Sequence, residues 1–580
     1  MTTYDEKPWL KHYDKHVTPE IPVPEISYLK VLERGLSHDP DRIALHFLGT
    51  TCTYRQLDDL SSRFAAYLAD KGCVKGDVIG INLPNIPQYS IAKVGISKVG
   101  GVISGVSPLL TPKELAHQLK DSKAKVLITL DILFQERLLK ISEPLPDLKQ
   151  IVVTNVADYL SPVKQFLGKL LKKIPSGKIS PLSGKEIIPY KKLISSYPAE
   201  KPTVEISPDD TCLLQYTGGT TGPSKGTILT HRNIVFNIAQ LIQGIDQSLK
   251  PDGDIFDCER GQDIVCSGFP FFHQAGLILG LIHLCLGNTQ ILVPDPRNTT
   301  QICKDIDVYK PTSLVNVPTL YQLMMENPLF KTIDLSSIKY CMSGAAPFDN
   351  DSFRLLESFV GEGKVVELYG MTETSPLITI NPIFGKKKIG SVGIPAQNTR
   401  VKIVDTETGE KEMPVGEPGE LIVNGPQVMK GYHGNPKATA ETIRDFKGEK
   451  WLYTGDVAKM DEDGYFFIVD RTKDMLLVGG FNVYSKQIEE TLYEIPEVDL
   501  CAIIGKPNPD RPGSELVKAV IQLTAQAKGD DPKALEEKII AHCKENLAAY
   551  KVPRIIEFVN EIPLTAVGKI DKKALRIQKK

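Results

Sequence analysis

The run YTGGTTGPSKGT, residues 216–227, combines glycines and hydroxylated residues with a single lysine, Lys225. Glycines let backbone amides turn into a common hollow, hydroxyls add donors and the lysine adds charge, which together suit a polyphosphate. The apolar residues 212–216 predict a buried strand, and residues 228–242 predict a helix that begins near Thr230. A strand, a glycine loop and a helix in this order are typical of a nucleotide-phosphate site.

This loop departs from the standard P-loop, G-x-x-x-x-G-K-[ST]. Gly226 follows Lys225 where the magnesium-binding hydroxyl would stand, which argues against a kinase or motor ATPase. A surface loop with an ordinary solvated lysine is the alternative interpretation. The candidate phosphate-binding residues are Thr217, Gly218, Gly219, Thr220, Thr221, Gly222 and Lys225.

Bulk composition narrows the class of protein. A chain of 580 residues exceeds one typical core, so two or more domains are expected. The 69 basic and 71 acidic side chains nearly balance, which argues against a nucleic-acid binder. The ten cysteines include no C-x-x-C pair and are typical of buried thiols in a reducing compartment, so neither a zinc site nor a disulfide framework is indicated.

The sequence shows no export or membrane-spanning signal. Residues 1–16 are polar, and the longest apolar stretch, residues 276–286, is too short to cross a bilayer. These features predict a soluble, cytoplasmic protein, with peripheral contact on the inner face of the membrane as a further expectation.

Strands and helices alternate along the first part of the chain. Residues 53–72 fit a helix with a T-x-x-Q capping box at Thr53 and Gln56, and Thr111 and Glu114 begin another helix in the same way. The alternation predicts a largely parallel sheet with crossover helices. The expected strands are VIGINL, GVISGV, KVLIT, QIVVT, TQILVP and TSLVNV.

The pattern changes after about Gly385. GSVGIPAQ, VKIVD, GELIVNG and YFFIVD are short strands between glycine turns, which predict an antiparallel subdomain over about 384–472. A smaller unit follows, with helices near 485–493 and 532–547. We expect one domain over residues 1–472 and a second over 473–580.

Four further segments carry a family resemblance. ELYGMTETSP (367–376), YTGDVAKMDEDGYFFIVDRTKD (453–474), GGFNVYSKQIE (479–489) and PLTAVGKIDKKAL (563–575) join the glycine loop in the order of the adenylate-forming enzymes. The chain resembles this superfamily of acyl-CoA synthetases, adenylation domains and luciferases over most of its length, and is most similar to bacterial-type long-chain fatty acyl-CoA synthetases.

The resemblance implies an α/β fold: a large N-terminal domain of two mostly parallel sheets with a small β-subdomain, and a small mobile α+β C-terminal domain. It implies ligation of a carboxylic acid to coenzyme A. The acid and MgATP would give an acyl-AMP and pyrophosphate, and thiol attack would then give the acyl-CoA and AMP. The implied cofactor is Mg²⁺, with ATP and CoA as co-substrates and a monomer or homodimer as the assembly.

The resemblance also implies catalytic residues. Lys569 would bridge the carboxylate and the α-phosphate, although a solvated lysine in a basic tail is the alternative. Glu373 would bind magnesium, since a hard cation that bridges phosphates takes carboxylate oxygen, and Thr372 would donate to the α-phosphate. His273, in SGFPFFHQAGL, would lie near the substrate carboxylate, or is a satisfied core histidine.

The nucleotide site follows from the same motifs. Asp456 would accept both ribose hydroxyls, because a carboxylate takes two hydrogen bonds at once, and Arg471 would add a donor. Tyr369 would stack on one face of adenine. Residues of SGAAP would pack on the other face. The remaining residues implied for ATP and AMP are Gly344, Ala345, Ala346, Pro347, Glu367 and Gly370.

Lys473 occupies the hinge position of the family. Rotation of the C-terminal domain there would present Lys569 for the first half-reaction and remove it for the second. The loop of Gly479, Gly480 and Phe481 would then bind CoA, with Gly480 leaving room for pantetheine.

Two observations bear on the acid. The segment 267–277 is aromatic or neutral, and burial of a substrate ammonium there would be costly, so a free apolar acid is favoured over an amino acid. Residues Val163–Lys173 place apolar side chains on one helical face and lysines on the other, which suits contact with an anionic membrane or packing on the domain itself. We expect a long-chain fatty acid first, and a medium-chain or aryl acid second.

Two other classes remain. A P-loop phosphotransferase would use the glycine loop without Lys569, and a non-catalytic nucleotide-binding protein would bind ATP yet release no pyrophosphate. Oxygenation of the luciferase type is an alternative within the family.

Overall fold

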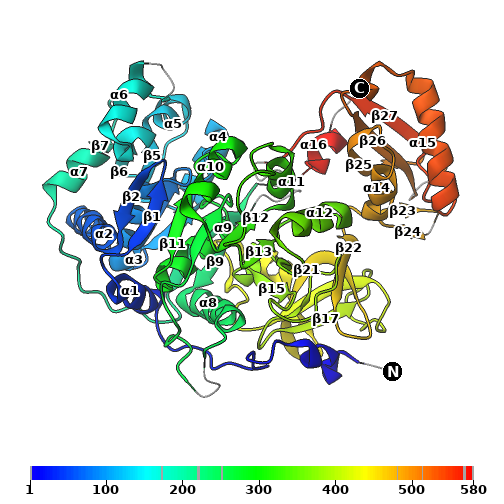
Figure 1. The fold of residues 1–580 in the computed structure, drawn as a ribbon, viewed down its shortest axis with the longest axis horizontal. Helices are drawn as coiled ribbons and strands as arrows, with labels where there is room; N and C mark the ends of the chain where they lie inside the picture. The colour runs from blue at the N-terminus through cyan, green and yellow to red at the C-terminus, as the bar shows by residue number, and fades with distance from the viewer. Residues whose placement is uncertain are drawn as a thin grey trace. The chain divides into compact units, whose positions relative to one another are not determined.

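The computed structural model describes residues 3–170, 174–217, 223–249, 253–479, 481–511, 514–565 and 570–577. The chain forms two units, whose elements are labelled in Figure 1. Unit 1 comprises Met1–Pro8, Val401–Val423 and Phe446–Lys580, and unit 2 comprises Trp9–Arg400 and Asn424–Asp445.

Unit 2 contains two sheets. The first has nine strands in the order β16-β15-β14-β13-β12-β10-β11-β1-β2, and the run from β14 to β1 is parallel. Its strands are β1 (Ile43–Phe47), β2 (Thr50–Thr53), β10 (Ile264–Ser267), β11 (Thr289–Leu292), β12 (Ser313–Asn316), β13 (Tyr340–Ser343), β14 (Val365–Gly370), β15 (Leu377–Ile380) and β16 (Ile394–Pro395).

The second sheet has eight strands in the order β19-β9-β8-β4-β3-β5-β6-β7, parallel from β8 to β7. Its strands are β3 (Val78–Asn82), β4 (Val102–Gly105), β5 (Val126–Leu130), β6 (Gln150–Thr154), β7 (Glu186–Pro189), β8 (Thr211–Thr217), β9 (Lys225–Thr230) and β19 (Gly431–Tyr432). The prediction of mostly parallel sheets is confirmed.

Helices connect these strands, as crossover connections require. They are α1 (Tyr28–His38), α2 (Tyr54–Asp70), α3 (Pro87–Lys98), α4 (Pro112–Asp121), α5 (Asp131–Glu136), α6 (Pro162–Leu170), α7 (Tyr190–Ser196), α8 (His231–Ile245), α9 (Gln274–Cys285), α10 (Thr299–Tyr309), α11 (Pro318–Glu326), α12 (Asn350–Val360) and α13 (Pro436–Thr442). The capping boxes at Thr53 and Thr111 are confirmed.

Unit 1 contains three small sheets. A five-stranded sheet is formed by β17 (Arg400–Val404), β18 (Gly419–Asn424), β20 (Ile443–Phe446), β21 (Glu449–Met460) and β22 (Phe466–Arg471), in which β21 pairs antiparallel with β18 and with β22. Of β20, only Phe446 is assigned to unit 1. The others are the pair β23 (Leu476–Val478) and β24 (Phe481–Val483), and the sheet of β25 (Val498–Pro507), β26 (Glu515–Leu523) and β27 (Ile555–Val559). Helices α14 (Ser485–Tyr493), α15 (Pro532–Asn546) and α16 (Lys572–Ile577) complete the unit.

The helix predicted to begin near Thr230 is confirmed, since α8 begins at His231 with Thr230 as its N-cap. Sequence reasoning missed strand β9 between the glycine loop and this helix, where residues 225–230 pair antiparallel with β8. The strand within GSVGIPAQ, β16, pairs with β15 in the nine-stranded sheet instead of joining the β-subdomain. Residues 401–423 and 446–472 group with the C-terminal residues in unit 1, whereas the predicted limit between the two domains lies between residues 472 and 473.

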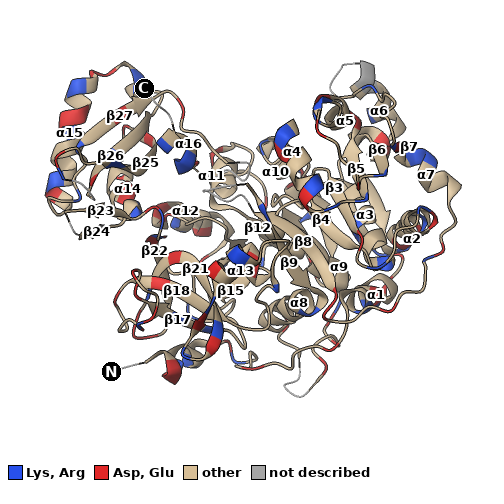
Figure 2. Ribbon diagram, turned by 180° about the vertical axis from the view of Figure 1, so that it is seen from behind, with Lys and Arg blue, Asp and Glu red and all other residues tan. Residues whose placement is uncertain are grey.

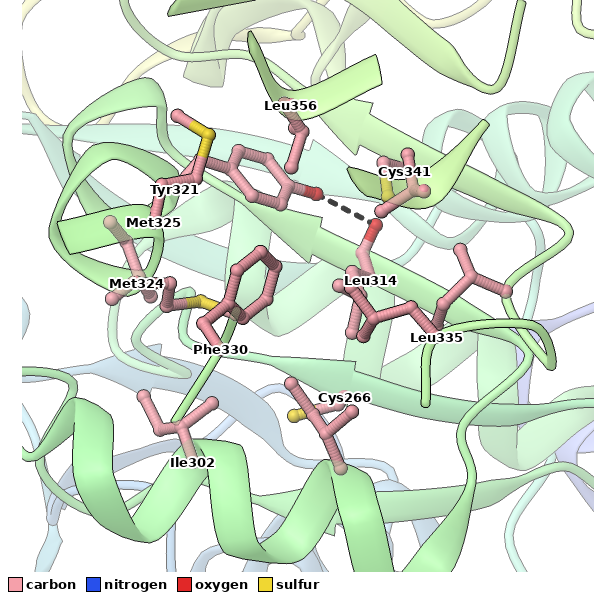
Figure 3. Packing of buried hydrophobic residues seen from close by; sticks show 14 of the residues in the cluster. Cys266, Ile302, Leu314, Tyr321, Met324, Met325, Phe330, Leu335, Cys341 and Leu356 are labelled. Atoms are coloured by element: carbon pink, nitrogen blue, oxygen red, sulfur yellow. Dashed lines mark hydrogen bonds between the residues drawn. The ribbon is translucent and has the colours of Figure 1, made fainter. Parts of the chain in front are cut away.

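One hydrophobic cluster of unit 2 lies between the nine-stranded sheet and helices α10 to α12 (Figure 3). Tyr321 is fully buried there, and its hydroxyl donates to the carbonyls of Leu314 and Met342, each at 2.9 Å. All ten cysteines of the chain are buried as free thiols. Charged residues of both signs are interspersed on the outer helices (Figure 2), as the balanced composition suggests.

Candidate functional site

A buried carboxylate lies at the centre of the predicted site residues of unit 2. Glu373 lies in a short 3₁₀ turn, Thr372–Thr374, that follows β14, and it is only 6% exposed. Its Oε1 accepts a hydrogen bond of 2.7 Å from the Tyr432 hydroxyl, and its backbone carbonyl accepts one from the Met429 amide. Burial, and then the carboxylate itself, raise the pKa of Tyr432, so the hydroxyl stays protonated and donates.

Tyr432 connects this carboxylate to the phosphate-loop lysine. Strand β19 pairs with β9, which places Tyr432 opposite Thr227. The Lys225 Nζ lies 4.3 Å from the centre of the Tyr432 ring, a cation–π distance. Lys225 is paired in register with Thr217 across the hairpin of β8 and β9. The predicted loop residues Gly218 to Gly222 lie outside the described residues.

Sequence reasoning missed Tyr432. Its segment, KGYHG, supplies the only signal, an aromatic residue between two glycines. Gly431 has φ +148° and packs against Thr439, whose hydroxyl accepts from the Tyr432 amide. The bond to Thr439 fixes the backbone of Tyr432. The neighbours of its side chain become evident only from the pairing of β19 with β9.

The predicted adenine-site residues gather at the carboxyl ends of two neighbouring strands. β13 and β14 are parallel, with Ser343 opposite Glu367, so the turns that follow them lie at one edge of the sheet. This is the edge where α/β sheets bind ligands. Only glycine fits at position 370, because a Cβ atom there would lie 1.7 Å from the Pro376 carbonyl oxygen. The residues brought together at this edge are Gly344, Ala345, Ala346, Pro347, Glu367, Tyr369 and Gly370.

The segment 267–277, which we call the acyl segment because it is predicted to face the acid, packs against the second sheet of the same unit. The side-chain amide of Gln215, on β8, donates to the Phe272 carbonyl, and the Tyr89 hydroxyl donates to the Phe271 carbonyl at 2.8 Å. His273 is the N-cap residue of α9 and is half-buried. The segment carrying His273 is therefore bonded to the strand that leads into the glycine loop.

Lys93, on α3, is a second residue that sequence reasoning missed. It is fully buried, and burial lowers its pKa to about 7. Its Nζ has no hydrogen-bond partner among the described residues and lies 4.4 Å from the centre of the Phe271 ring. Gly280 of α9 makes room for this amine, since a Cβ there would lie 2.3 Å from Nζ.

In unit 1 the predicted ribose residues form an ion pair. Asp456 on β21 and Arg471 on β22 face each other in register, and Arg471 Nε lies 3.0 Å from Asp456 Oδ1. The carboxylate is mostly buried, whereas the guanidinium is 47% exposed. The pair is compatible with a carboxylate that binds hydroxyls beside a solvated cation.

The predicted CoA loop and catalytic lysine are described in part. Gly479 has φ +60°, and Phe481 is 56% exposed and stacks on Tyr550 with ring centres 4.7 Å apart. Gly480 lies outside the described residues, as does Lys569. The predicted hinge residue Lys473 lies in the turn after β22.

Glu373 suits magnesium as a ligand that acts together with substrate phosphates, rather than as part of a site built from protein side chains alone. The described part of the chain has no group of three or more His, Cys, Asp or Glu side chains that could hold a metal ion by themselves. Magnesium usually binds one or two carboxylates together with substrate phosphates, so the buried Glu373 carboxylate suits it as one of several ligands. None of the described helices combines the length and apolar character that a membrane crossing needs.

Comparisons with known proteins identify the family of the chain. The family model described as AMP-binding enzyme matches residues 32–433, and that of the AMP-binding enzyme C-terminal domain matches residues 487–569. The chain is 38% identical to a long-chain-fatty-acid–CoA ligase of Bacillus subtilis, over 98% of both chains, and 33% identical to a feruloyl-CoA synthase of an Amycolatopsis species, over 93% of this chain and 96% of that one. The crystal structure of an anthranilate CoA ligase in complex with anthranoyl-AMP superposes with a TM-score of 0.80 at 27% identity, covering 96% and 97% of the two chains.

Proposed function

Because this chain belongs to the AMP-binding enzyme family and is an acyl-CoA ligase, we propose that it activates long-chain fatty acids. The acid carboxylate attacks the α-phosphorus of ATP, pyrophosphate leaves, and the thiol of CoA then displaces AMP from the acyl-AMP. One observation carries the choice of acid, namely the similarity to a long-chain-fatty-acid–CoA ligase over 98% of both chains. The aromatic and neutral acyl segment supports it, because it offers no charged partner for a polar acid.

We assign the roles in unit 2 by chemistry. Lys225 and Thr217 bind the phosphates, and Thr372 donates to the α-phosphate. Glu373, oriented by Tyr432, would hold magnesium, whose charge offsets that of the phosphates. His273 lies near the acid carboxylate.

We assign the remaining roles to unit 1. Asp456 accepts the ribose hydroxyls, and Arg471 adds a donor beside it. Lys569 stabilises the charge that develops as the carboxylate attacks. Gly479, Gly480 and Phe481 receive CoA, and Lys473 is the hinge.

The test measures pyrophosphate release and acyl-CoA formation over straight-chain acids from acetate to oleate, and over benzoate and ferulate, with and without CoA. A CoA-dependent optimum at palmitate or oleate supports the proposal. An optimum at short or aromatic acids would retain the ligase chemistry but overturn the long-chain assignment. The feruloyl-CoA synthase relative makes an aryl acid the second candidate.

Helix α6 supports a contact with anionic membrane, where long-chain acids partition. Val163 and Phe166 are 67% and 68% exposed on it. Residues 159–185 contain lysines and no acidic residue, and part of that range lies outside the described residues. Apolar side chains beside lysines suit a surface of anionic phospholipid.

Vesicle co-sedimentation tests this contact. The double variant Val163→Ser/Phe166→Ser should bind phosphatidylglycerol vesicles less than the unmodified protein does, while Val308→Ser, at an equally exposed valine on α10, should bind unchanged. Equal binding by all three proteins, or equal binding to phosphatidylcholine vesicles, would overturn the contact.

A further inference from the structure

Helix α16 begins three residues after Lys569 and is held by two ion pairs. The Lys572 Nζ lies 2.7 Å from Glu489 Oε1 and donates to the Ser485 hydroxyl at 2.7 Å, both on α14. Lys572 and Glu489 are each only 15% exposed at their side chains. The pair is thus largely shielded from solvent, where screening by salt is weak.

The second ion pair reaches the predicted hinge. Arg576, one turn further along α16, places Nη2 2.7 Å from Oδ1 of Asp474, the residue directly after Lys473. Asp474 is 14% exposed at its side chain. The backbone amide of Asp474 is itself bonded to the Arg471 carbonyl, so the contact ends on the turn that follows β22.

The described residues that precede and follow the stretch 566–569 are paired with each other. Leu564 and Ile570 form an antiparallel bridge, and the Asp571 amide donates to the Pro563 carbonyl at 2.8 Å. Asp571 also caps α16 through a bond from the Ala574 amide. The segment that leads into α16 therefore starts from a fixed point, and the two ion pairs fix the helix itself.

We propose that Lys572 and Arg576 are positioning residues for the first half-reaction: they tie the segment that follows Lys569 to α14 and to the turn beside Lys473. These ties hold helix α16, which follows the predicted catalytic lysine in the chain, to α14 and to the turn after β22. A misplacement of about 1 Å, caused far from the reacting atoms, can cost about 10²-fold in rate. The inference rests on the function proposed above, since only acyl-AMP formation uses Lys569.

Separate assays of the two half-reactions test the proposal. Arg576→Ala and Lys572→Ala should lower pyrophosphate release from acid and ATP by about 10- to 100-fold, within the range that misplacement costs. The same variants, supplied with synthetic acyl-AMP, should convert it to acyl-CoA at close to the unmodified rate. Lys573→Ala is the matched control on the same helix and should change neither rate.

Charge exchange separates positioning from simple destabilisation. Asp474→Arg combined with Arg576→Asp should restore most of the pyrophosphate release that either single change removes. Equal loss in both half-reactions, or no loss in either, would overturn the inference while the unmodified protein still forms acyl-CoA. Failure of the unmodified protein to release pyrophosphate would instead overturn the proposed function.

Discussion

The two units each contain a lysine that is largely shielded from solvent, but its surroundings differ. In unit 2, Lys93 has no hydrogen-bond partner among the described residues and rests against the Phe271 ring, and burial lowers its pKa to about 7. In unit 1, Lys572 is held by the Glu489 carboxylate and the Ser485 hydroxyl. Burial without a polar partner disfavours the charged form of the Lys93 amine, whereas the ion pair and the hydrogen bond of Lys572 fix its position against α14.

The same contrast holds for the two carboxylates. Glu373 of unit 2 accepts a hydrogen bond from the Tyr432 hydroxyl, a neutral donor that does not offset its negative charge. Glu489 of unit 1 lies against Lys572, which offsets that charge. The Tyr432 hydroxyl can thus orient the Glu373 carboxylate without cancelling its charge, whereas the Lys572 ammonium offsets the charge of Glu489 and holds α16 against α14.

The largest effect should follow from a change in unit 1. Lys569→Ala should lower pyrophosphate release by about 10²–10³-fold, the usual cost of losing one group that stabilises developing charge. The same variant should still convert synthetic acyl-AMP to acyl-CoA. Steady-state assays of each half-reaction check both outcomes, and an unchanged rate of pyrophosphate release would remove Lys569 from the mechanism.

A change in unit 2 sharpens the contrast between the carboxylates. Tyr432→Phe removes the hydroxyl that orients Glu373, and loss of such an outer-shell group typically costs about 10–100-fold in metal affinity or activity. We therefore expect pyrophosphate release to need more magnesium, as measured by titration with MgCl₂. Tyr493→Phe, on α14 of unit 1, is the control. An unaltered magnesium requirement would leave Tyr432 a purely structural role.

Much of the fold was predictable because its signals are local. The capping boxes at Thr53 and Thr111 involve residues three positions apart. The alternation of strands and helices can likewise be recognised from consecutive stretches of sequence. Helix α14 has the predicted bounds, 485–493. The family motifs named most of the candidate site in the same way, because each motif is a short continuous run.

What escaped prediction depends on pairing between distant segments. Tyr432 meets Glu373 across 59 residues, and Lys93 meets Phe271 only because α3 packs beside the acyl segment. Strand β9 was missed, because only its pairing with β8 distinguishes residues 225–230 from a loop before the helix that begins at His231. No single-residue pattern carries such information.

Lys93 of unit 2 should make the free energy of unfolding depend on pH. Above about pH 7 the folded protein holds Lys93 neutral, whereas the unfolded chain keeps that proton up to the ordinary lysine pKa of 10.5. The unfolded state therefore binds more protons in this window, and stability should rise with pH by up to about 1.4 kcal/mol per unit from this group. Urea unfolding at pH 7, 8 and 9 measures it.

Lys93→Met is the comparison for that experiment. The substitution should raise stability at pH 7 and flatten the dependence between pH 7 and 9, because replacement of an unsatisfied buried cation by an apolar side chain removes its desolvation cost. Lys113→Met, at an exposed lysine of α4, is the control and should leave the slope unchanged. A slope that is the same with and without Lys93 would contradict the lowered pKa.

The smallest effect is expected at the solvent-facing ion pair of unit 1. Arg471→Ala should lower the free energy of unfolding by about 0–1 kcal/mol, since the guanidinium is nearly half exposed and such pairs contribute little. Thermal unfolding at low and high salt checks this. A loss of several kcal/mol would place Arg471 among the groups that hold the fold, beside Lys572.

The burial of every cysteine makes the protein a convenient subject for site-specific labelling. A maleimide reacts with an exposed thiolate, and burial both covers each native sulfur and raises its pKa, as it does at Cys212 and Cys266. One cysteine introduced at an exposed position of each unit, such as Val74 in unit 2 and Ile577 in unit 1, would then carry a donor and an acceptor dye without removal of any native residue. Energy transfer between the dyes would follow the separation of the units through a single catalytic turnover.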